Sequence, residues 1–221
     1  APLRFVDRGF RSIAVETAGG VLIRVGTSTE AAVGYELEIQ ALPFVTTHVD
    51  TAVPAPQWYV EPNNDVPYGA MGYPMLPGSN PKWGIEPPEQ FALGLGRFMA
   101  QLHSAPVDQA SEAGVREVSP FQRLIGAEDV VLPVLHDRLS DPEFKHVQAW
   151  WEEFRSDDRM RKYELSVCYH DLWHGNLLIG ESGELAGVLD WSHVEIGDRA
   201  HDFSAIRYFG ERFRERLIGA Y

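Results

Sequence analysis

The 221-residue sequence has a single cysteine, Cys168, and lacks any apolar run of the ~20 residues that a membrane-spanning helix needs. One cysteine excludes a disulfide within the chain, and the mainly apolar residues 165–167 before it predict a buried free thiol. No stretch combines a charged start with an apolar centre as a signal peptide does. We therefore expect a cytoplasmic protein that has no membrane partner.

Basic residues are also scarce, because 19 Lys and Arg side chains stand against 32 Asp and Glu side chains, which gives a formal net charge of −13. Such a charge disfavours binding to a phosphate backbone, so we expect no nucleic-acid partner, and it is compatible with a cationic one. Repeats and low-complexity segments are lacking too. The hydrophobic content of 44% supplies a core for one large domain or two lobes.

The most informative stretch has the pattern of a β-hairpin. Two short apolar runs, 177–179 and 188–189, flank the turn-rich segment 180–184, so we place the bend near Gly183. Antiparallel pairing about that bend sets Asn176 opposite Asp190, since the two positions are equidistant from it. Both side chains then lie at the open end of the hairpin, beside the loop that carries Asp171.

Asp171, Asn176 and Asp190 together have the composition of a phosphoryl-transfer site. In such sites one carboxylate orients the acceptor hydroxyl, an Asn on the same loop binds magnesium, and a later Asp binds the metal that bridges the nucleotide phosphates. Any one of these residues alone is more often a turn former. The combination predicts Asp171 as the catalytic residue and Asn176 and Asp190 as Mg²⁺ ligands.

This segment resembles the catalytic and metal-binding motifs of the aminoglycoside phosphotransferase family, small-molecule kinases that share the protein-kinase-like fold. The family motif usually reads His-Gly-Asp, followed by four residues and Asn. Here Tyr169 occupies the usual His position and His170 the usual Gly position, whereas Asp171, Asn176 and Asp190 are in place. The resemblance extends from about residue 5 to residue 209.

The resemblance implies a two-lobed α+β protein. Residues 1–77 would form an N-terminal nucleotide-binding lobe with an antiparallel sheet and a helix, and residues 78–221 a mainly helical catalytic lobe that contains the β-hairpin. The alternating residues at 3–6, 12–16 and 21–25 independently predict three consecutive antiparallel strands. We place Gly9 and Ser12, at the turn between the first two strands, over the nucleotide phosphates.

Arg24 ends the third predicted strand, where the kinase fold keeps a cation that contacts phosphate. Kinases pair that cation with a glutamate of the following helix. We expect Glu38 to be the partner of Arg24, with Glu36 as the rival candidate. The segment 68–78 then predicts a strand that runs into a proline-bounded connector. The backbone of Met75 and Leu76 in this connector is expected to bind a purine edge.

Three helices are predicted from their apolar spacing. The first follows the N-cap cluster 27–30 and ends near Pro43, the second follows Pro88, and the third precedes residue 157. Asp198 is expected to cap a further helix. The apolar positions are Val33, Leu37 and Ala41 in the first helix, Phe91, Leu95, Phe98, Met99 and Leu102 in the second, and Phe144, Val147, Trp150, Trp151 and Phe154 in the third.

The final residues, 217–221, read as the middle of a helical region. An apolar set in the last twenty or so residues is expected to need a further partner to cover it. We therefore expect a catalytic lobe that is truncated at its C-terminal end, or an acceptor site that is open and self-associating. The set comprises Phe203, Ile206, Tyr208, Phe209, Phe213 and Leu217.

The sequence thus predicts a phosphotransferase that uses Mg²⁺ and moves the γ-phosphoryl group of ATP or GTP to a hydroxyl of a small molecule, such as an aminoglycoside or another metabolite. The choice of nucleotide and of acceptor stays open. One alternative is a metal-dependent phosphohydrolase, suggested by the His-Asp pairs at 170–171 and 201–202. Another is a catalytically weak nucleotide-binding protein of kinase-like fold, suggested by Tyr169.

Overall fold

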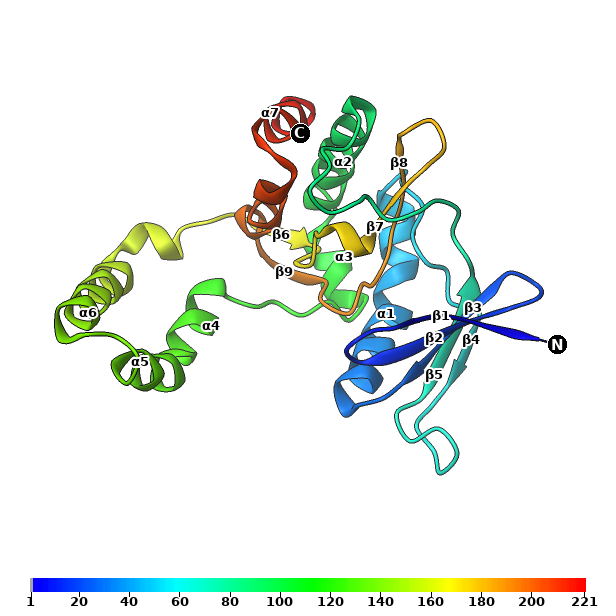
Figure 1. Cartoon of the computed structure of the whole chain (residues 1–221), viewed down its shortest axis with the longest axis horizontal. Coiled ribbons are helices and arrows are strands. Elements are labelled where there is room, and N and C mark those ends of the chain that lie inside the picture. The colour runs from blue at the N-terminus through cyan, green and yellow to red at the C-terminus, as the bar shows by residue number, and fades with distance from the viewer. Residues whose placement is uncertain (1) are drawn as a thin grey trace.

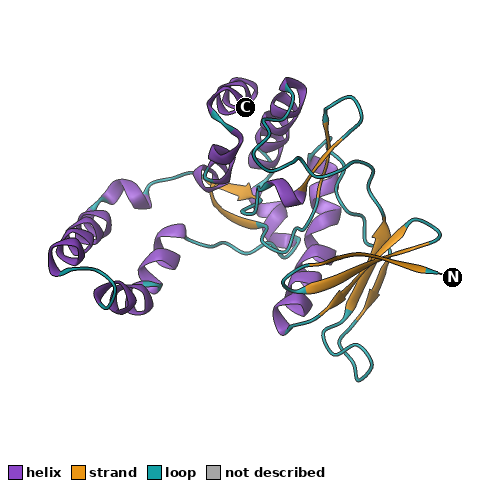
Figure 2. Cartoon of the chain, in the orientation of Figure 1, coloured by secondary structure: helices purple, strands orange, loops and turns teal. Residues whose placement is uncertain are grey.

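The computed structural model describes residues 2–221, apart from the side chains of Arg8, Pro120, Ala205 and Arg207. A sheet-containing N-terminal lobe adjoins a mainly helical C-terminal lobe (Figures 1 and 2). The strands of the first lobe form one antiparallel sheet in the order β1-β2-β3-β5-β4, with the helix α1 (Thr29–His48) beside it. These strands are β1 (Leu3–Arg8), β2 (Ser12–Thr17), β3 (Val21–Gly26), β4 (Trp58–Val60) and β5 (Ala70–Pro74).

The first three strands confirm the sequence prediction, and β4 was missed because its three residues are too short a run to show a pattern. Arg24 does not end β3 as predicted. It is paired with Ala14 of β2 on one side and Met71 of β5 on the other, in the interior of the sheet. Because β3 is paired with a strand on each side, the backbone that carries the Arg24 side chain is rigid. The lobe boundary at residues 77/78 stays a prediction.

Helix α1 differs from its prediction in its buried face and its length. Ala41 is buried as expected, but the Val33 side chain is 57% exposed. A four-residue step exceeds the 3.6-residue turn by about 40°, so an apolar stripe with that spacing drifts around the helix. The helix also continues beyond Pro43. Burial of Phe44 and Val45 compensates for the backbone hydrogen bond that proline cannot donate.

The C-terminal lobe combines helices with two small antiparallel ladders, β6 with β9 and β7 with β8. Its α-helices are α2 (Glu89–His103), α3 (Val107–Glu112), α4 (Pro120–Gly126), α5 (Glu128–His136), α6 (Asp141–Ser156) and α7 (Glu211–Ala220). Its strands are β6 (Leu165–Cys168), β7 (Leu177–Ile179), β8 (Leu185–Val188) and β9 (Glu195–Asp198). Its 3₁₀ helices are η1 (Asp158–Arg161), η2 (His174–Asn176), η3 (Arg199–Phe203) and η4 (Ala205–Phe209). None of the described helices is long and apolar enough to span a bilayer.

Helix α2 lies at the centre of this lobe, and all five of its predicted core residues are completely buried. It packs along α7, where the rings of Phe91 and Phe213 lie 6.2 Å apart. Ile206, Phe213 and Leu217 are also completely buried in the same core. For these three residues the core of the lobe already supplies the cover, whereas Tyr208 of the same set is 57% exposed, so the expected truncation of the lobe stays a prediction. Asp198 caps η3 as predicted, its side chain accepting a hydrogen bond from the Ala200 amide at 2.9 Å.

Helices α4, α5 and α6 form an arm that extends from the rest of the lobe, at the left of Figure 1. The third predicted apolar stripe lies on α6, yet of its members only Trp151 is buried, and Trp150 is 52% exposed. The Phe154 ring instead stacks on Phe121 of α4 at 5.6 Å. An amphipathic pattern here reflects packing between short helices of the arm, not burial in the main core.

The β7–β8 hairpin forms as predicted, with its register shifted by one residue. The amide of Leu189 donates to the carbonyl of Asn176 at 2.7 Å, so Asn176 lies opposite Leu189 and not Asp190. The bend closes between Gly180 and Glu184, one residue earlier than predicted, and a bulge in the ladder restores only part of the shift. Asn176 and Asp190 nevertheless lie at the same open end.

The contact between α2 and α7 leads to a stability prediction. A Cβ atom at Gly96 of α2 would collide with the carbonyl oxygen of Leu217 in α7. We expect Gly96→Ala to lower the free energy of unfolding in denaturant by about 1–3 kcal/mol, because an overpacked contact forces the helices apart. Gly219→Ala on α7, where a Cβ would meet nothing within 4 Å, should change it by less than about 1 kcal/mol. Equal effects of the two substitutions would contradict the packing argument.

Candidate active site

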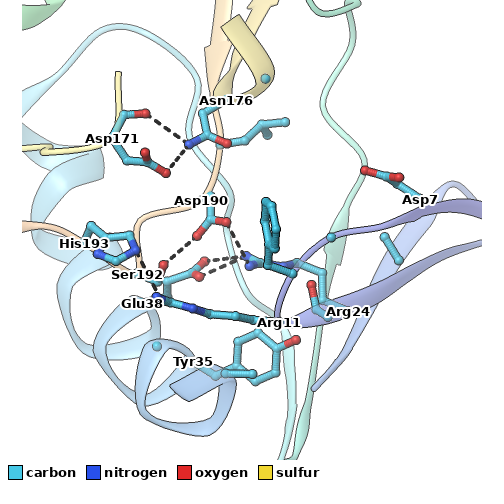
Figure 3. A pocket seen from close by; sticks show the side chains of 18 of the residues that line it. Asp7, Arg11, Arg24, Tyr35, Glu38, Asp171, Asn176, Asp190, Ser192 and His193 are labelled. Carbon is cyan, nitrogen blue, oxygen red and sulfur yellow. Dashed lines mark hydrogen bonds and ion pairs between the residues drawn. The ribbon is translucent and has the colours of Figure 1, made fainter. Parts of the chain in front are cut away.

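A cavity of about 750 Å³ lies between the sheet, α1 and the β7–β8 hairpin (Figure 3), and this size is typical of small-molecule sites. It draws residues from the β1–β2 turn, β3, α1, the loop after β6 and the segment after β8. Its lining includes seven of the residues predicted from the sequence, namely Gly9, Ser12, Arg24, Glu38, Asp171, Asn176 and Asp190.

Asp171 and Asn176 are joined directly. The Asn176 Nδ2 group donates to the Asp171 carboxylate at 2.6 Å and to the Asp171 backbone carbonyl at 3.1 Å. Because Nδ2 makes both bonds, the amide oxygen of Asn176 faces away from Asp171. Burial raises the pKa of Asp171, and the hydrogen bond from Asn176 only partly opposes the rise. The pair therefore presents one carboxylate with enhanced basicity and one neutral oxygen ligand.

Asp190 lies two residues after the end of β8 and has a left-handed backbone conformation, with φ 53°, which aspartate tolerates better than most residues. Its Oδ1 accepts a hydrogen bond from the Ser192 hydroxyl at 2.8 Å, and its Oδ2 lies 3.4 Å from the Arg24 Nη2. Burial acts to raise the pKa of Asp190, but Arg24 and Ser192 outweigh it and hold the pKa below its usual value. Asp190 therefore stays ionised.

Arg24 makes the ion pair with Glu38 that the sequence predicted, at 2.9 and 3.1 Å from Nη1 to the two carboxylate oxygens. The Glu38 side chain is completely buried and that of Arg24 is 11% exposed, whereas Glu36 is exposed on another face of α1. Burial raises the pKa of Glu38 to about 7, with Arg24 opposing the rise. Arg24 thus connects β3 to α1 and, through Asp190, to the hairpin (Figure 3).

The two connector residues are not brought into the cavity. The Met75 amide donates to the carbonyl of Gly20 at 2.8 Å, because the chain after β5 continues to pair with the β2–β3 turn. Neither Met75 nor Leu76 belongs to the cavity lining among the described residues. The Met75 amide is therefore already engaged, and the expectation that the backbone of Met75 and Leu76 binds a purine edge stays a prediction. Gly9 lines the cavity, but its amide donates to the Ser12 carbonyl and so closes the turn.

The residues that depart from the family motif are accommodated by local geometry. His170 has φ 67°, a left-handed conformation that glycine adopts without cost and histidine more readily than most residues. The Tyr169 hydroxyl donates to the backbone carbonyl of Leu189, next to Asp190, and the Tyr169 ring packs on Trp191 at 4.9 Å. Tyr169 thus braces the loop against the hairpin.

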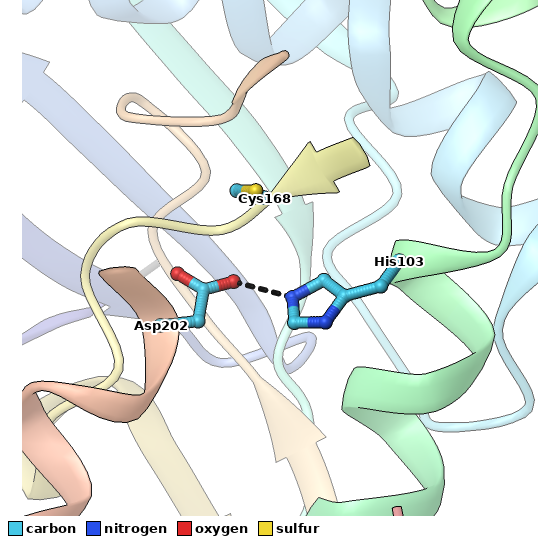
Figure 4. Close-up of side chains that lie close together, drawn as sticks. All are labelled: His103, Cys168 and Asp202. Atoms are coloured by element: carbon cyan, nitrogen blue, oxygen red, sulfur yellow. Dashed lines mark hydrogen bonds and ion pairs between the residues drawn. The ribbon is translucent and has the colours of Figure 1, made fainter. Parts of the chain in front are cut away.

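A buried cluster beneath the loop has the residue types of a metal site, with His103, Cys168 and Asp202 close together (Figure 4). Its polar atoms are already used. His103 is hydrogen-bonded to Asp202 through Nε2 and to the Tyr221 hydroxyl through Nδ1, each at 3.0 Å. The Cys168 thiol donates to the Ser166 carbonyl, and burial raises its pKa, which disfavours the thiolate a metal needs. The cluster is a hydrogen-bonded anchor.

Asp202 extends this anchor to the catalytic loop. Its two carboxylate oxygens accept hydrogen bonds from the amides of Tyr169 and His170, at 2.8 and 2.6 Å. The phosphohydrolase alternative would need Asp202 as a metal ligand beside His201. In the structure the His170 and His201 rings are instead stacked, 4.2 Å apart and nearly parallel. The two His-Asp pairs therefore give no convergent set of metal ligands.

Sequence reasoning missed several cavity residues, above all Arg11 and His193. The Arg11 Nη1 lies 3.3 Å from the His193 Nε2, across 182 positions of the chain. His193 follows the predicted Asp190 by three positions, which was the available signal for it. Arg11 belongs to no motif of recognisable spacing. Its partner His193 lies in the other lobe, so the sequence around Arg11 carries no signal for the contact.

Residues 4–221 match the sequence profile of the phosphotransferase enzyme family. A curated relative, the uncharacterized protein YcbJ of Bacillus subtilis (strain 168), is 26% identical over 173 residues. The aligned part is 68% of this chain and 53% of the relative, so the chain spans about half the length of the curated relative that it matches.

Three solved structures illustrate the likeness of fold. The GDP complex of wild-type aminoglycoside 2'-phosphotransferase-IIIa has a TM-score of 0.85 at 21% identity, covering 100% of this chain and 76% of that one. For the streptomycin–ATP–APH(2")-IIa ternary complex the values are 0.80, 17%, 100% and 77%. For the macrolide 2'-phosphotransferase MphH from Brachybacterium faecium they are 0.74, 20%, 99% and 75%. The likeness confirms the predicted protein-kinase-like, two-lobed α+β fold.

The buried ion pair predicts a pH-dependent stability loss in Arg24→Met. Without the guanidinium the pKa of Glu38 rises further, so the folded state holds a proton that the unfolded state has released. The stability deficit relative to the wild type should therefore grow as the pH rises through about 7, toward the roughly 3–5 kcal/mol of a broken buried pair. Denaturant unfolding at pH 6 and pH 8.5 measures it. Arg24→Met/Glu38→Gln should largely lose this pH dependence, and a deficit of Arg24→Met that does not change with pH would contradict the argument.

Proposed function

Because the chain belongs to the phosphotransferase enzyme family, we propose that it transfers the γ-phosphoryl group of ATP or GTP to a hydroxyl of a small molecule. The observation that carries the proposal is the convergence of Asp171, Asn176 and Asp190 on one cavity beneath Arg24. A coupled assay of nucleoside diphosphate release tests it, run with ATP and with GTP across a panel of aminoglycosides, macrolides and hydroxylated metabolites.

Asp171 is the proposed catalytic base. Its raised pKa suits a group that accepts the proton of the acceptor hydroxyl, and the bond from Asn176 fixes the orientation of its carboxylate. In the transfer, the bond from the γ-phosphorus to the β–γ bridging oxygen breaks and its electron pair leaves with the nucleoside diphosphate. A bond forms from the acceptor oxygen to the phosphorus, and the hydroxyl proton passes to Asp171.

Asn176 and Asp190 fit the predicted Mg²⁺ site. Mg²⁺ prefers hard oxygen ligands, and this pair offers the amide oxygen that faces away from Asp171 and a carboxylate that stays ionised. Bound there, the ion would neutralise charge on the nucleotide phosphates. Arg24 reaches Asp190 from the sheet side, so its guanidinium is proposed to contact the same phosphates, with Gly9 and Ser12 above them.

The nature of the acceptor is supported by charge and by the relatives. The net charge of −13 favours a cationic acceptor, and one structural relative is a complex with streptomycin. Another relative is a macrolide phosphotransferase. A hydroxylated, positively charged small molecule is therefore the first class to test. The alternative of a nucleotide-binding protein with weak turnover was suggested by Tyr169, and the bracing of the loop by this residue supports the active enzyme instead.

Asp171→Asn should lower the turnover number by about 10²–10⁴, because the substitution keeps the shape and removes the base. Nucleotide affinity measured by calorimetry should be nearly unchanged. In the wild type, turnover should fall as the pH drops through a value above the usual aspartate range. Asp137→Asn, which alters an exposed carboxylate at the end of α5, serves as the control. Near-normal phosphoryl transfer by Asp171→Asn would refute the assignment.

Asp190→Ala should abolish the part of nucleotide binding that depends on magnesium, and Asn176→Ala should weaken it and raise the magnesium requirement. The difference is expected because a charged oxygen binds a hard cation more strongly than a neutral amide does. Calorimetric titration of each variant with ATP or GTP, in magnesium and then in a chelator, separates metal-dependent from metal-independent binding. Unchanged binding of the magnesium nucleotide by Asp190→Ala would show that the ligands lie elsewhere.

A further inference from the structure

The cavity holds a second arginine that the family motif does not explain. Arg11 lies at the end of the β1–β2 turn, and its side chain extends across the cavity toward the segment after β8 (Figure 3). Its Nη1 lies 3.3 Å from the His193 Nε2. A guanidinium only donates hydrogen bonds, so the His193 nitrogen is the acceptor. This bond joins the N-terminal lobe to the C-terminal lobe at the mouth of the cavity.

The two arginines of the cavity differ in how their charge is used. Arg24 is buried and paired with Glu38 and Asp190. Arg11 is exposed, and among the described side chains no carboxylate forms an ion pair with it. The pKa of Glu30 is lowered first by a hydrogen bond from Ser28 and only in smaller part by Arg11. Among the described ion pairs Arg11 thus differs from Arg24, because its guanidinium is not held by a carboxylate.

His193 locates that charge relative to the chemistry. It lines the same cavity as Asp171 and Asp190 and follows Asp190 by three positions (Figure 3). The group that seats Arg11 is therefore adjacent both to the proposed base and to the proposed metal ligand. Arg11 lines the same cavity, so a phosphoryl group transferred there would have this guanidinium beside its path.

We propose that Arg11 is a catalytic residue that contacts the γ-phosphoryl group during transfer, and that His193 is the positioning residue that seats it. This inference rests on the proposed function. As the bond to the bridging oxygen breaks and the bond to the acceptor oxygen forms, charge develops on the oxygens around phosphorus. A guanidinium already placed there stabilises that charge more than the charge of the bound nucleotide. Arg24, held by two carboxylates, serves the ground-state phosphates.

The proposal predicts a selective loss in Arg11→Ala. The turnover number should fall by about 10²–10³, while the KM for the nucleotide changes by less than about threefold, because the contact is made mainly in the transition state. Hydrolysis of the nucleotide, with water as the acceptor and release of nucleoside diphosphate as the readout, gives this measurement before the natural acceptor is identified. Arg11→Lys should recover only part of the rate, since an ammonium does not reproduce the planar fork.

A binding measurement tests the same contact without turnover. Magnesium, ADP and aluminium fluoride together mimic the transferring phosphoryl group. In the wild type, aluminium fluoride should tighten the binding of magnesium ADP, measured by calorimetry. In Arg11→Ala that gain should fall by about 10²-fold, with the affinity for magnesium ADP alone preserved. Arg4→Ala, which removes an exposed arginine of β1 that pairs with Glu16, is the matched control and should keep the full gain.

His193 is tested by a pair of substitutions. His193→Ala removes the acceptor that seats Arg11 and should lower the turnover number by about tenfold or more. His193→Gln keeps a hydrogen-bond acceptor and should restore most of the rate and of the aluminium fluoride gain. A merely structural role would not distinguish alanine from glutamine in this way, because both variants lose the ring.

The possible results separate this inference from the proposed function. The titration is run with ADP and with GDP. If the wild type binds neither magnesium ADP nor magnesium GDP, or gains nothing from aluminium fluoride with either, the proposed function fails and the inference fails with it. If the wild type shows the gain and Arg11→Ala shows it equally, only the role of Arg11 is overturned. Loss of the gain in Arg11→Ala and its retention in Arg4→Ala would establish the contact.

Discussion

Arg24 lies between two carboxylates that come from different parts of the chain, Glu38 on α1 and Asp190 after β8. Burying a guanidinium and a carboxylate costs several kcal/mol per ion, which only close pairing recovers. The sheet, the helix and the hairpin are consequently held in one arrangement, since moving any of them would leave a buried charge unpaired. The cavity exists because these three elements meet around a single cation.

A second anchor sets the catalytic loop within this frame. Asp202 accepts hydrogen bonds from two successive backbone amides, Tyr169 and His170, and from the ring of His103 on α2. This ties the loop to the most buried helix of the lobe. Because Asp202 holds the Tyr169 and His170 amides, the left-handed backbone of His170 is tolerated. The chain can therefore turn sharply at His170 and direct Asp171 into the cavity.

The sequence predicted the parts of the site that depend on local order. Asp171 and Asn176 lie on one loop, and Glu38 was preferred to Glu36 because residues 41–43 after it resemble the end of the corresponding helix in the family. The errors came from features that spacing does not encode. The hairpin bends one residue earlier than predicted, which sets Asn176 opposite Leu189, and the bond between Arg11 and His193 joins distant segments. Patterns identify elements, whereas packing decides their register and their partners.

The surroundings of Asp171 and Asp190 shift the pKa values of these two cavity residues in opposite directions. Burial pushes both pKa values upward, but the hydrogen-bond partners of the Asp171 carboxylate, Asn176 and Trp173, are neutral, whereas Asp190 faces the Arg24 guanidinium. The environments therefore move the two pKa values apart, which is how one site assigns a base and a permanent anion to residues of the same type. A base has to gain and lose a proton in each cycle, and a metal ligand has to stay charged throughout. The same cation that holds the lobes together thus supports the proposed division of roles, because Arg24 is the largest of the influences that lower the pKa of Asp190 against burial.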